Sequence, residues 1–237
     1  MGYHSSPATA FLMTLFNVRL GAWLPNPAIA STEQLERAKP VNAVVSLARE
    51  LMGMTSDRSR DVYLSDGGHF ENLGLYEMVR RRCRYILAID AGADTAAEFE
   101  DLGNAVRKIR IDFDIDIVFD PPVAIGSRQQ PLDPFRDFAC ARILYPDPGA
   151  APGYLIYLKP SYPPDMAIDV RAYANLHPAF PHESTADQFF TESQFESYRQ
   201  LGEDEADRLL GDATSLAGLF EAARQQLTSP TAAVARN

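Results

Sequence analysis

The segment that decides the fold is Arg84-Tyr85-Ile86-Leu87-Ala88-Ile89-Asp90, in which an unbroken apolar run stands between two charged residues. A short continuous apolar run is typical of a strand whose two faces are both covered, as in parallel sheets flanked by helices. We therefore predict a buried parallel strand at 84–90. The segments on either side of it decide what surrounds that strand.

Helical and extended patterns alternate around this run. Apolar residues at helical spacing predict a helix at 72–82, a second helix is expected at about 95–110, and short strands are expected at 62–64 and 115–119, the last stopped by Pro121-Pro122. Such alternation favours a mainly parallel sheet with helices on its faces.

The second half of the chain predicts two more strands and then helices. The strands, at 139–145 and 154–159, are separated by a turn-rich segment and resemble a hairpin, and helices are expected at 193–210 and 215–226. Near the N-terminus we expect helices over 11–20 and from Ser31 to about Met52. The predicted fold class is α/β with a partly parallel sheet flanked by helices, forming one partial domain over 1–227 and a disordered tail over 228–237.

Composition narrows the possible partners and location. The chain of 237 residues has a formal net charge of -10, which argues against a nucleic-acid partner because phosphate binding needs a basic face. Its two cysteines, Cys83 and Cys140, are expected to be small buried residues without a disulfide. We see no signal peptide or transmembrane segment in the chain, so we expect a cytoplasmic protein or one peripheral to a membrane.

The candidate chemistry lies in the segment from Leu64 to Leu73, which begins Leu64-Ser65-Asp66-Gly67-Gly68-His69. A strand delivers the Asp66 carboxylate to the edge of a sheet, and Gly67 and Gly68 then let the backbone turn sharply. A carboxylate fixed in this way is well placed to act as a general base. Asp-Gly is also a common turn dipeptide, so a purely structural turn is the alternative.

A resemblance to a known protein family extends well beyond this turn. The segment from Tyr63 to Asp94, including Asp66-Gly67-Gly68-His69-Phe70-Glu71-Asn72-Leu73-Gly74-Leu75, resembles the Asp-Gly-Gly region of the patatin-like phospholipase family. Two flanking stretches resemble the same family: Asn17 to Gly21 with Trp23 and Asn26-Pro27, and His177 to Arg199. The chain is thus similar to the C-terminal portion of such a domain.

This resemblance implies a carboxylic ester hydrolase of lipid degradation that uses a Ser–Asp dyad and needs no metal or organic cofactor. Asp66 would be the base, Gly67 and Gly68 would shape its turn, and His69 would have no required proton-transfer role. No serine of the chain lies in a G-x-S-x-G elbow, and no glycine-rich oxyanion loop precedes the motif. We therefore expect the serine in an upstream part of the same polypeptide, a lipid or acyl ester substrate at a membrane surface, and no activity in the isolated chain.

Two alternatives come from other classes of protein. One is a non-catalytic interaction or regulatory protein that keeps the fold. The other is a metal-dependent transferase using the acids of Asp112-Phe113-Asp114-Ile115-Asp116, although these alternating residues are better explained as the entry to a strand.

Other polar groups have structural explanations as well. Asp90 and Asp94 end the predicted strand at the edge expected to carry Asp66, where they cap a helix, with shaping a cleft or binding an ion as the alternatives. The arginines Arg80, Arg81, Arg82 and Arg84 form a solvated helix end or touch anionic headgroups.

Overall fold

The computed structural model describes residues 21–37, 45–46, 48–49, 52, 54, 56–132, 135–184 and 189–228. The expected helix at 11–20, part of the one expected from Ser31 to Met52, and the expected tail apart from Thr228 lie outside these residues. The chain divides into two compact units, Met1–Asn72 and Leu73–Asn237, and each is described by itself.

The first unit contains a two-stranded antiparallel sheet. Strand β1 (Gly21–Pro25) pairs with β2 (Asp61–Ser65), from Gly21 opposite Ser65 to Pro25 opposite Asp61. A short helix, α2 (Thr32–Arg37), follows β1. The strand expected at 62–64 is confirmed as part of β2. Its partner β1 is antiparallel to it, which corrects the expectation of a mainly parallel sheet for this strand.

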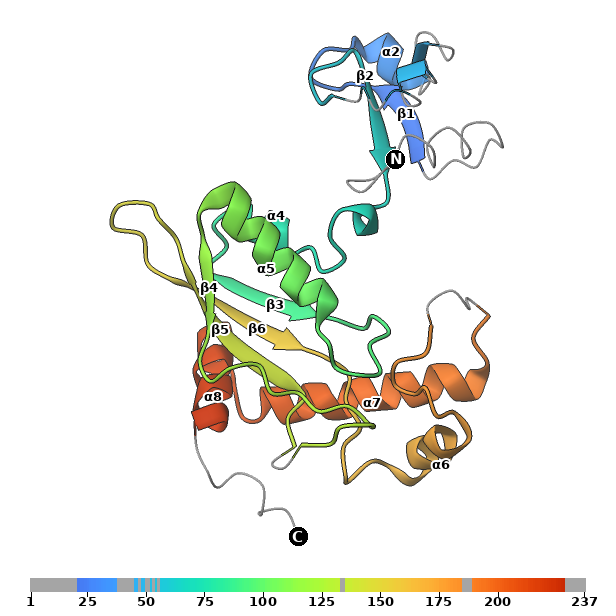
Figure 1. Ribbon diagram of the computed structural model, residues 1–237, viewed down its shortest axis with the longest axis vertical. Coiled ribbons are helices and arrows are strands. Elements are labelled where there is room, and N and C mark those ends of the chain that lie inside the picture. Colours follow the sequence, from blue (N-terminus) through green and yellow to red (C-terminus); the bar gives the residue numbers. More distant parts are fainter. Residues whose placement is uncertain are drawn as a thin grey trace. The chain divides into compact units, whose positions relative to one another are not determined.

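The second unit is built on a four-stranded mixed sheet. Its strands are β3 (Tyr85–Ile89), β4 (Asp116–Phe119), β5 (Phe138–Leu144) and β6 (Gly153–Leu158), in the order β3-β6-β5-β4 (Figure 1). Only β3 and β6 run parallel, whereas β5 is antiparallel to both β6 and β4. The expected β5–β6 hairpin is confirmed, and the fold is α/β with a partly parallel sheet.

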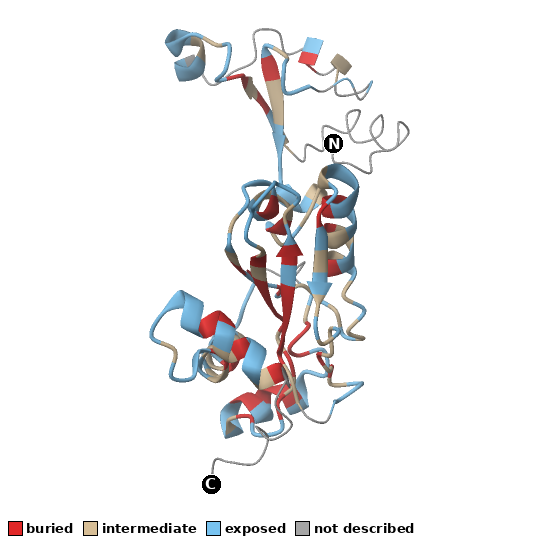
Figure 2. Ribbon diagram, turned by 90° about the vertical axis from the view of Figure 1, so that its left-hand side faces the viewer, coloured by how far each residue is buried: buried red, intermediate tan, exposed pale blue. Residues whose placement is uncertain are grey.

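Helices cover both faces of this sheet. On one face lie α4 (Leu75–Arg80) and α5 (Glu100–Phe113), and the other carries α8 (Leu216–Thr228) and the end of α7 (Glu192–Leu210) (Figure 1). Helix α6 (Ile168–Leu176) packs on α7 around Phe180. Buried residues follow the strands and the inner sides of these helices (Figure 2).

Strand β3 is less buried than its apolar sequence predicts. Ile86 and Ala88 point into the core beneath α4 and α5 and are almost fully buried. Leu87 and Ile89, on the opposite face, are 45% and 60% exposed. The expectation of a strand covered on both faces is therefore wrong for β3. It is an edge strand, and α8, which covers Tyr85 at its start, leaves Leu87 and Ile89 largely uncovered.

Candidate functional site

The Asp66 turn begins where β2 ends at Ser65. Asp66 has extended backbone angles (φ -60°, ψ 134°) and caps a single 3₁₀ turn, η1 (Gly67–His69). Its Oδ1 accepts a hydrogen bond from the Gly68 amide at 2.8 Å. The exposed carboxylate is thus held by the backbone that follows it, as expected for the residue before a tight turn.

The two glycines of this turn have different surroundings. A Cβ added to Gly68 would lie 2.6 Å from Asn72 Oδ1 and 3.3 Å from Asp66 Oδ1, whereas a Cβ added to Gly67 would meet nothing within 4 Å. Any larger residue at position 68 must therefore displace the Asn72 side chain. Close packing accounts for Gly68, and nothing in the described contacts requires Gly67.

A serine and a histidine flank the same turn. Ser65 Oγ and His69 Nδ1 lie 2.5 Å apart and join the end of β2 to the end of η1. Sequence reasoning singled out His69 but not this pairing. A spacing of four residues across a turn brings the two side chains together, and the bond braces the backbone on both sides of Asp66.

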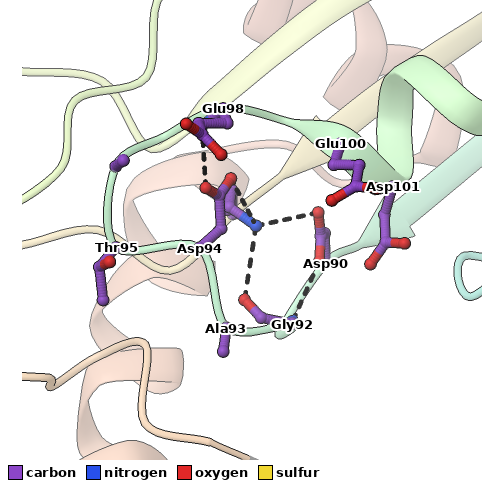
Figure 3. A pocket seen from close by; sticks show the side chains of 10 residues that line it. Asp90, Gly92, Ala93, Asp94, Thr95, Glu98, Glu100 and Asp101 are labelled. Carbon is purple, nitrogen blue, oxygen red and sulfur yellow. Dashed lines mark hydrogen bonds and ion pairs between the residues drawn. The ribbon is translucent and has the colours of Figure 1, made fainter.

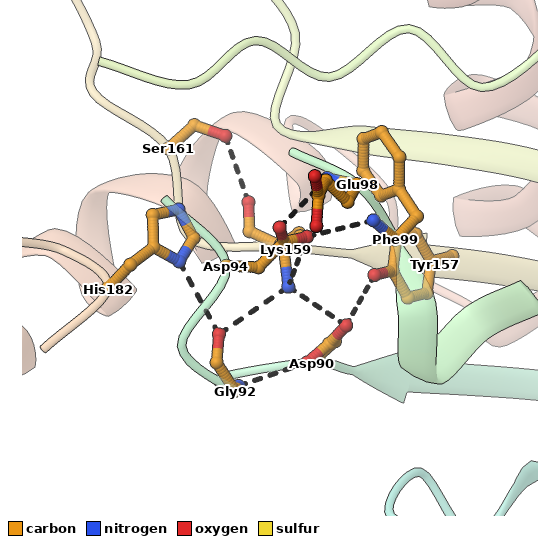
Figure 4. Close-up of polar contacts among 9 residues, drawn as sticks. All are labelled: Asp90, Gly92, Asp94, Glu98, Phe99, Tyr157, Lys159, Ser161 and His182. Carbon is orange, nitrogen blue, oxygen red and sulfur yellow. Dashed lines mark hydrogen bonds and ion pairs between the residues drawn. The ribbon is translucent and has the colours of Figure 1, made fainter. Parts of the chain in front are cut away.

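A second polar cluster lies in the other unit, at the carboxyl ends of the parallel strands β3 and β6. The last paired residues are Ile89 and Leu158, so Asp90 and Lys159 follow side by side (Figure 4). Lys159 Nζ lies 3.0 Å from Asp90 Oδ2 and 3.5 Å from Asp94 Oδ2, and the Lys159 side chain is only 3% exposed.

Tyrosine and backbone groups complete this cluster. Tyr157 donates its hydroxyl proton to Asp90 Oδ2 at 2.5 Å, and Gly92 donates its amide to Asp90 Oδ1 at 3.0 Å. Burial, together with this contact to Asp90, raises the pKa of Tyr157 far above its usual range. The Tyr157 hydroxyl therefore remains a hydrogen-bond donor.

Asp94 and His182 close the cluster from two loops. Asp94 accepts amide hydrogen bonds from Glu98 and Phe99, just before α5. Burial opposes ionisation of Asp94, but these amides and Lys159 outweigh it and lower the pKa of its carboxyl. His182 lies with Nδ1 3.4 Å from the Gly92 carbonyl oxygen, and its burial lowers the pKa of the imidazole.

Asp90, Asp94 and Lys159 of this cluster line an open cavity of about 240 Å³. The wall is mainly acidic, with Glu98, Glu100 and Asp101 beside the two aspartates in Figure 3, and Lys159 is the one basic residue in the described lining. Among the residues that the structure describes, no group of three His, Cys, Asp or Glu side chains is arranged to hold a metal ion. Because Asp90 and Asp94 are occupied by Lys159, Tyr157 and backbone amides, the cluster is best explained as a brace for the sheet edge.

The acidic segment at 112–116 does not form the expected strand entry. Asp112 and Phe113 belong to α5, and Asp114 follows with a left-handed backbone (φ 55°). Ile115 is buried, and only Asp116 lies in β4. The helix extends farther than expected, so the carboxylates do not line one face of a strand, which corrects the strand entry expected for this segment.

The arginine run is engaged in local contacts. Arg80 and Arg81 pair with Glu77 on the exposed end of α4, and Arg82 pairs with Asp147 at 2.7 Å. Arg84 lies over the Tyr85 ring. These contacts agree with the solvated helix end rather than a dedicated headgroup site.

Sequence reasoning missed Lys159, Tyr157 and His182 as members of a cluster. The available signal was the pairing of two strand ends: once β6 is placed beside β3, Asp90 and Lys159 must be neighbours. The hairpin pattern of β5 and β6 gave no indication that β6 also pairs with β3. His182 comes from a distant loop and carries no such signal.

Comparisons with models of protein families, with curated proteins and with solved structures find no match to this chain. In the described part of the chain, no helix is both long enough and apolar enough to span a bilayer. The assignment of function therefore depends on the Asp66 motif and its geometry.

Proposed function

We propose that this chain is the C-terminal part of a serine lipid acyl hydrolase in which Asp66 acts as the general base. One observation carries the proposal. Asp66 directly follows β2 and begins a glycine turn, and one of its carboxylate oxygens accepts a hydrogen bond from the Gly68 amide. Its Oδ2 accepts no hydrogen bond from the residues that the structure describes, and the side chain is exposed. That oxygen is available to a hydroxyl group from elsewhere in the polypeptide.

The chemistry assigned to Asp66 is proton transfer. A serine hydroxyl gives its proton to the Asp66 carboxylate as its oxygen attacks the ester carbonyl, and the departing alkoxide takes that proton as the acyl–oxygen bond breaks. Water then enters by the same route: Asp66 accepts a proton from the water as its oxygen bonds to the acyl carbon. The bond between the acyl carbon and the serine oxygen breaks, the serine oxygen takes the proton from Asp66, and the acyl group leaves as a carboxylic acid. The carboxylate is regenerated, so each cycle consumes only ester and water.

The serine in this scheme lies outside the chain. None of the serines here is preceded and followed by glycine at the spacing of a nucleophile elbow. The resemblance of the Asp66 segment to patatin-like hydrolases supports an upstream elbow and a glycine-rich loop whose amides would stabilise the oxyanion. The substrate we propose is a lipid acyl ester at a membrane surface.

Reading the coding DNA upstream of the Met1 codon tests this proposal. We expect an open frame that continues through a glycine-rich loop and a G-x-S-x-G sequence. An in-frame stop codon directly before Met1 would contradict the proposal and favour the interaction or regulatory protein. Ester turnover by this chain alone, if it disappeared in Asp66→Asn, would contradict the expectation that the serine lies elsewhere.

A further inference from the structure

The outer face of β3 leaves apolar side chains uncovered. Tyr85 is covered by Phe220 of α8, with ring centroids 5.0 Å apart, but the next residues on that face, Leu87 and Ile89, remain largely exposed. Leu158 continues this face on the neighbouring strand. An apolar stripe therefore runs along the sheet toward the carboxyl ends of β3 and β6.

Helix α7 faces this stripe across an open cavity of about 390 Å³. The helix contributes mainly apolar or small residues to the wall, among them Leu201, Gly202, Ala206 and Leu209. Ligand pockets are commonly of this size and are lined by apolar groups with one or two polar ones. The cavity lies wholly within the second unit and is separate from the acidic one.

One carboxyl group interrupts the apolar wall. Glu205 is only 1% exposed, and its Oε1 accepts a hydrogen bond from the Ser161 amide at 2.8 Å. The other oxygen makes no hydrogen bond with any residue that the structure describes. Arg208, one turn later in α7, is instead paired with Asp137 at 3.0 Å. Glu205 is thus a buried carboxyl without an ionic partner of its own.

The environment of Glu205 favours its neutral form. Burial raises the pKa of this carboxyl to about 8, and the charges of Asp137 and Asp204 act in the same direction while the Ser161 amide and Arg208 oppose them. Near neutral pH the group is mostly protonated and can donate a hydrogen bond. A neutral oxygen acceptor suits this protonated carboxyl better than a carboxylate does, because a second carboxylate would be repelled by the charges of Asp137 and Asp204.

We propose that this cavity binds a neutral, single-chain acyl ester, with its chain along Leu87 and Ile89 and its carbonyl oxygen facing Glu205. The apolar wall provides the contact for the chain, and the carboxyl provides one directional contact for the head. Binding requires neither Asp66 nor a serine nucleophile. It can therefore be measured on this chain whether or not the proposed hydrolysis is correct.

A pair of glycine substitutions tests the site. Gly202 lines the cavity and Gly103 lies on the exposed side of α5; both are helical, and a Cβ at either meets nothing within 4 Å. Gly202→Leu should fill the cavity, while Gly103→Leu is the matched control, and both changes raise helix propensity. Ala206→Leu is a second filling variant, and thermal unfolding checks that each variant is folded.

Binding of methyl decanoate, followed by saturation-transfer NMR and calorimetry, is the measurement. We expect the unmodified chain and Gly103→Leu to bind equally, and Gly202→Leu or Ala206→Leu to bind at least about tenfold more weakly. Glu205→Gln, which keeps a donor, should retain binding, and decanoate should bind at least about tenfold more weakly than the ester.

Three results would overturn the proposal. The first is no saturable binding of methyl decanoate by the folded chain. The second is undiminished binding by a folded variant with a filled cavity. The third is a dimer that becomes monomeric in Gly202→Leu without any ester binding, which would assign this face to a contact between two copies of the chain.

Discussion

Lys159 and Asp90 lie side by side one residue beyond the last pair of the parallel strands β3 and β6, with Nζ 3.0 Å from Oδ2. Both side chains are almost excluded from water. The pair fixes the edge of the sheet from which the loop to α5 departs, and Tyr157 and Asp94 supply the remaining contacts. The stability of this cluster depends on the presence of each of these four side chains.

Removing the cation from this cluster should destabilise the second unit strongly. Lys159→Met leaves the Asp90 carboxylate buried without its ionic partner, so we expect the free energy of unfolding to fall by about 3 to 5 kcal/mol. Urea unfolding followed by circular dichroism measures this change. Adding Asp90→Asn to Lys159→Met should recover part of the loss, and Arg199→Ala, which removes two exposed ion pairs, should change little. Unchanged stability in Lys159→Met would contradict the role of the pair.

The buried carboxyl of Glu205 should make stability depend on pH. Its pKa is about 8 in the folded chain against an ordinary value of 4.5, so the folded state holds the proton more tightly than the unfolded state. The free energy of unfolding should therefore decrease as the pH rises between these two values, by up to roughly 5 kcal/mol from this group.

Glu205→Gln should remove most of that decrease and should be more stable than the unmodified chain at about pH 8. Urea unfolding at several pH values compares the two proteins. Asp137, whose pKa burial also raises, contributes to the slope in both proteins. Parallel pH profiles for the two proteins would show that Glu205 is ionised in the folded chain.

The two cysteines should differ in their reaction with a thiol reagent. Cys140 is buried on the α8 side of β5, and burial raises the pKa of its thiol to about 12, whereas Cys83 is only half-buried. Because the thiolate is the reactive form, Cys140 should react at least about tenfold more slowly than Cys83 in the folded chain. Ellman's reagent measures both rates, with Cys83→Ser to assign the fast phase. Equal reaction rates of Cys83 and Cys140 in the native chain, with no acceleration in urea, would contradict the burial of Cys140.

Local patterns predicted most elements of the second unit. The runs at 84–90, 139–145 and 154–159 are strands because their apolar residues are continuous or alternate, and the turn-rich segment between the last two closes a hairpin. Helix limits were less accurate: α5 begins at Glu100 rather than near 95, after Asp94 has bound the amides of Glu98 and Phe99. Such side chain–backbone contacts compete with helix formation and cannot be read from periodicity.

The neighbours of each strand could not be predicted in the same way. The apolar sequence of β3 is compatible with a central strand, and only its position outside β6 explains why Leu87 and Ile89 are exposed. The Asp66 turn was predicted because Asp-Gly-Gly dictates local backbone geometry. The Lys159 cluster was missed because Lys159 and Tyr157 meet Asp90 and Asp94 only through tertiary pairing of residues 65 or more positions apart.

The central claim is that Asp66 is the base of an ester hydrolase, and the most direct measurement is turnover of a p-nitrophenyl ester by the polypeptide extended upstream through its serine elbow. Asp66→Asn should lower kcat by about 100- to 10,000-fold, the range expected when a general base is lost. Asp57→Asn, at another exposed aspartate of the same unit, is the matched control and should leave kcat unchanged. Full activity in a folded Asp66→Asn variant would contradict the account.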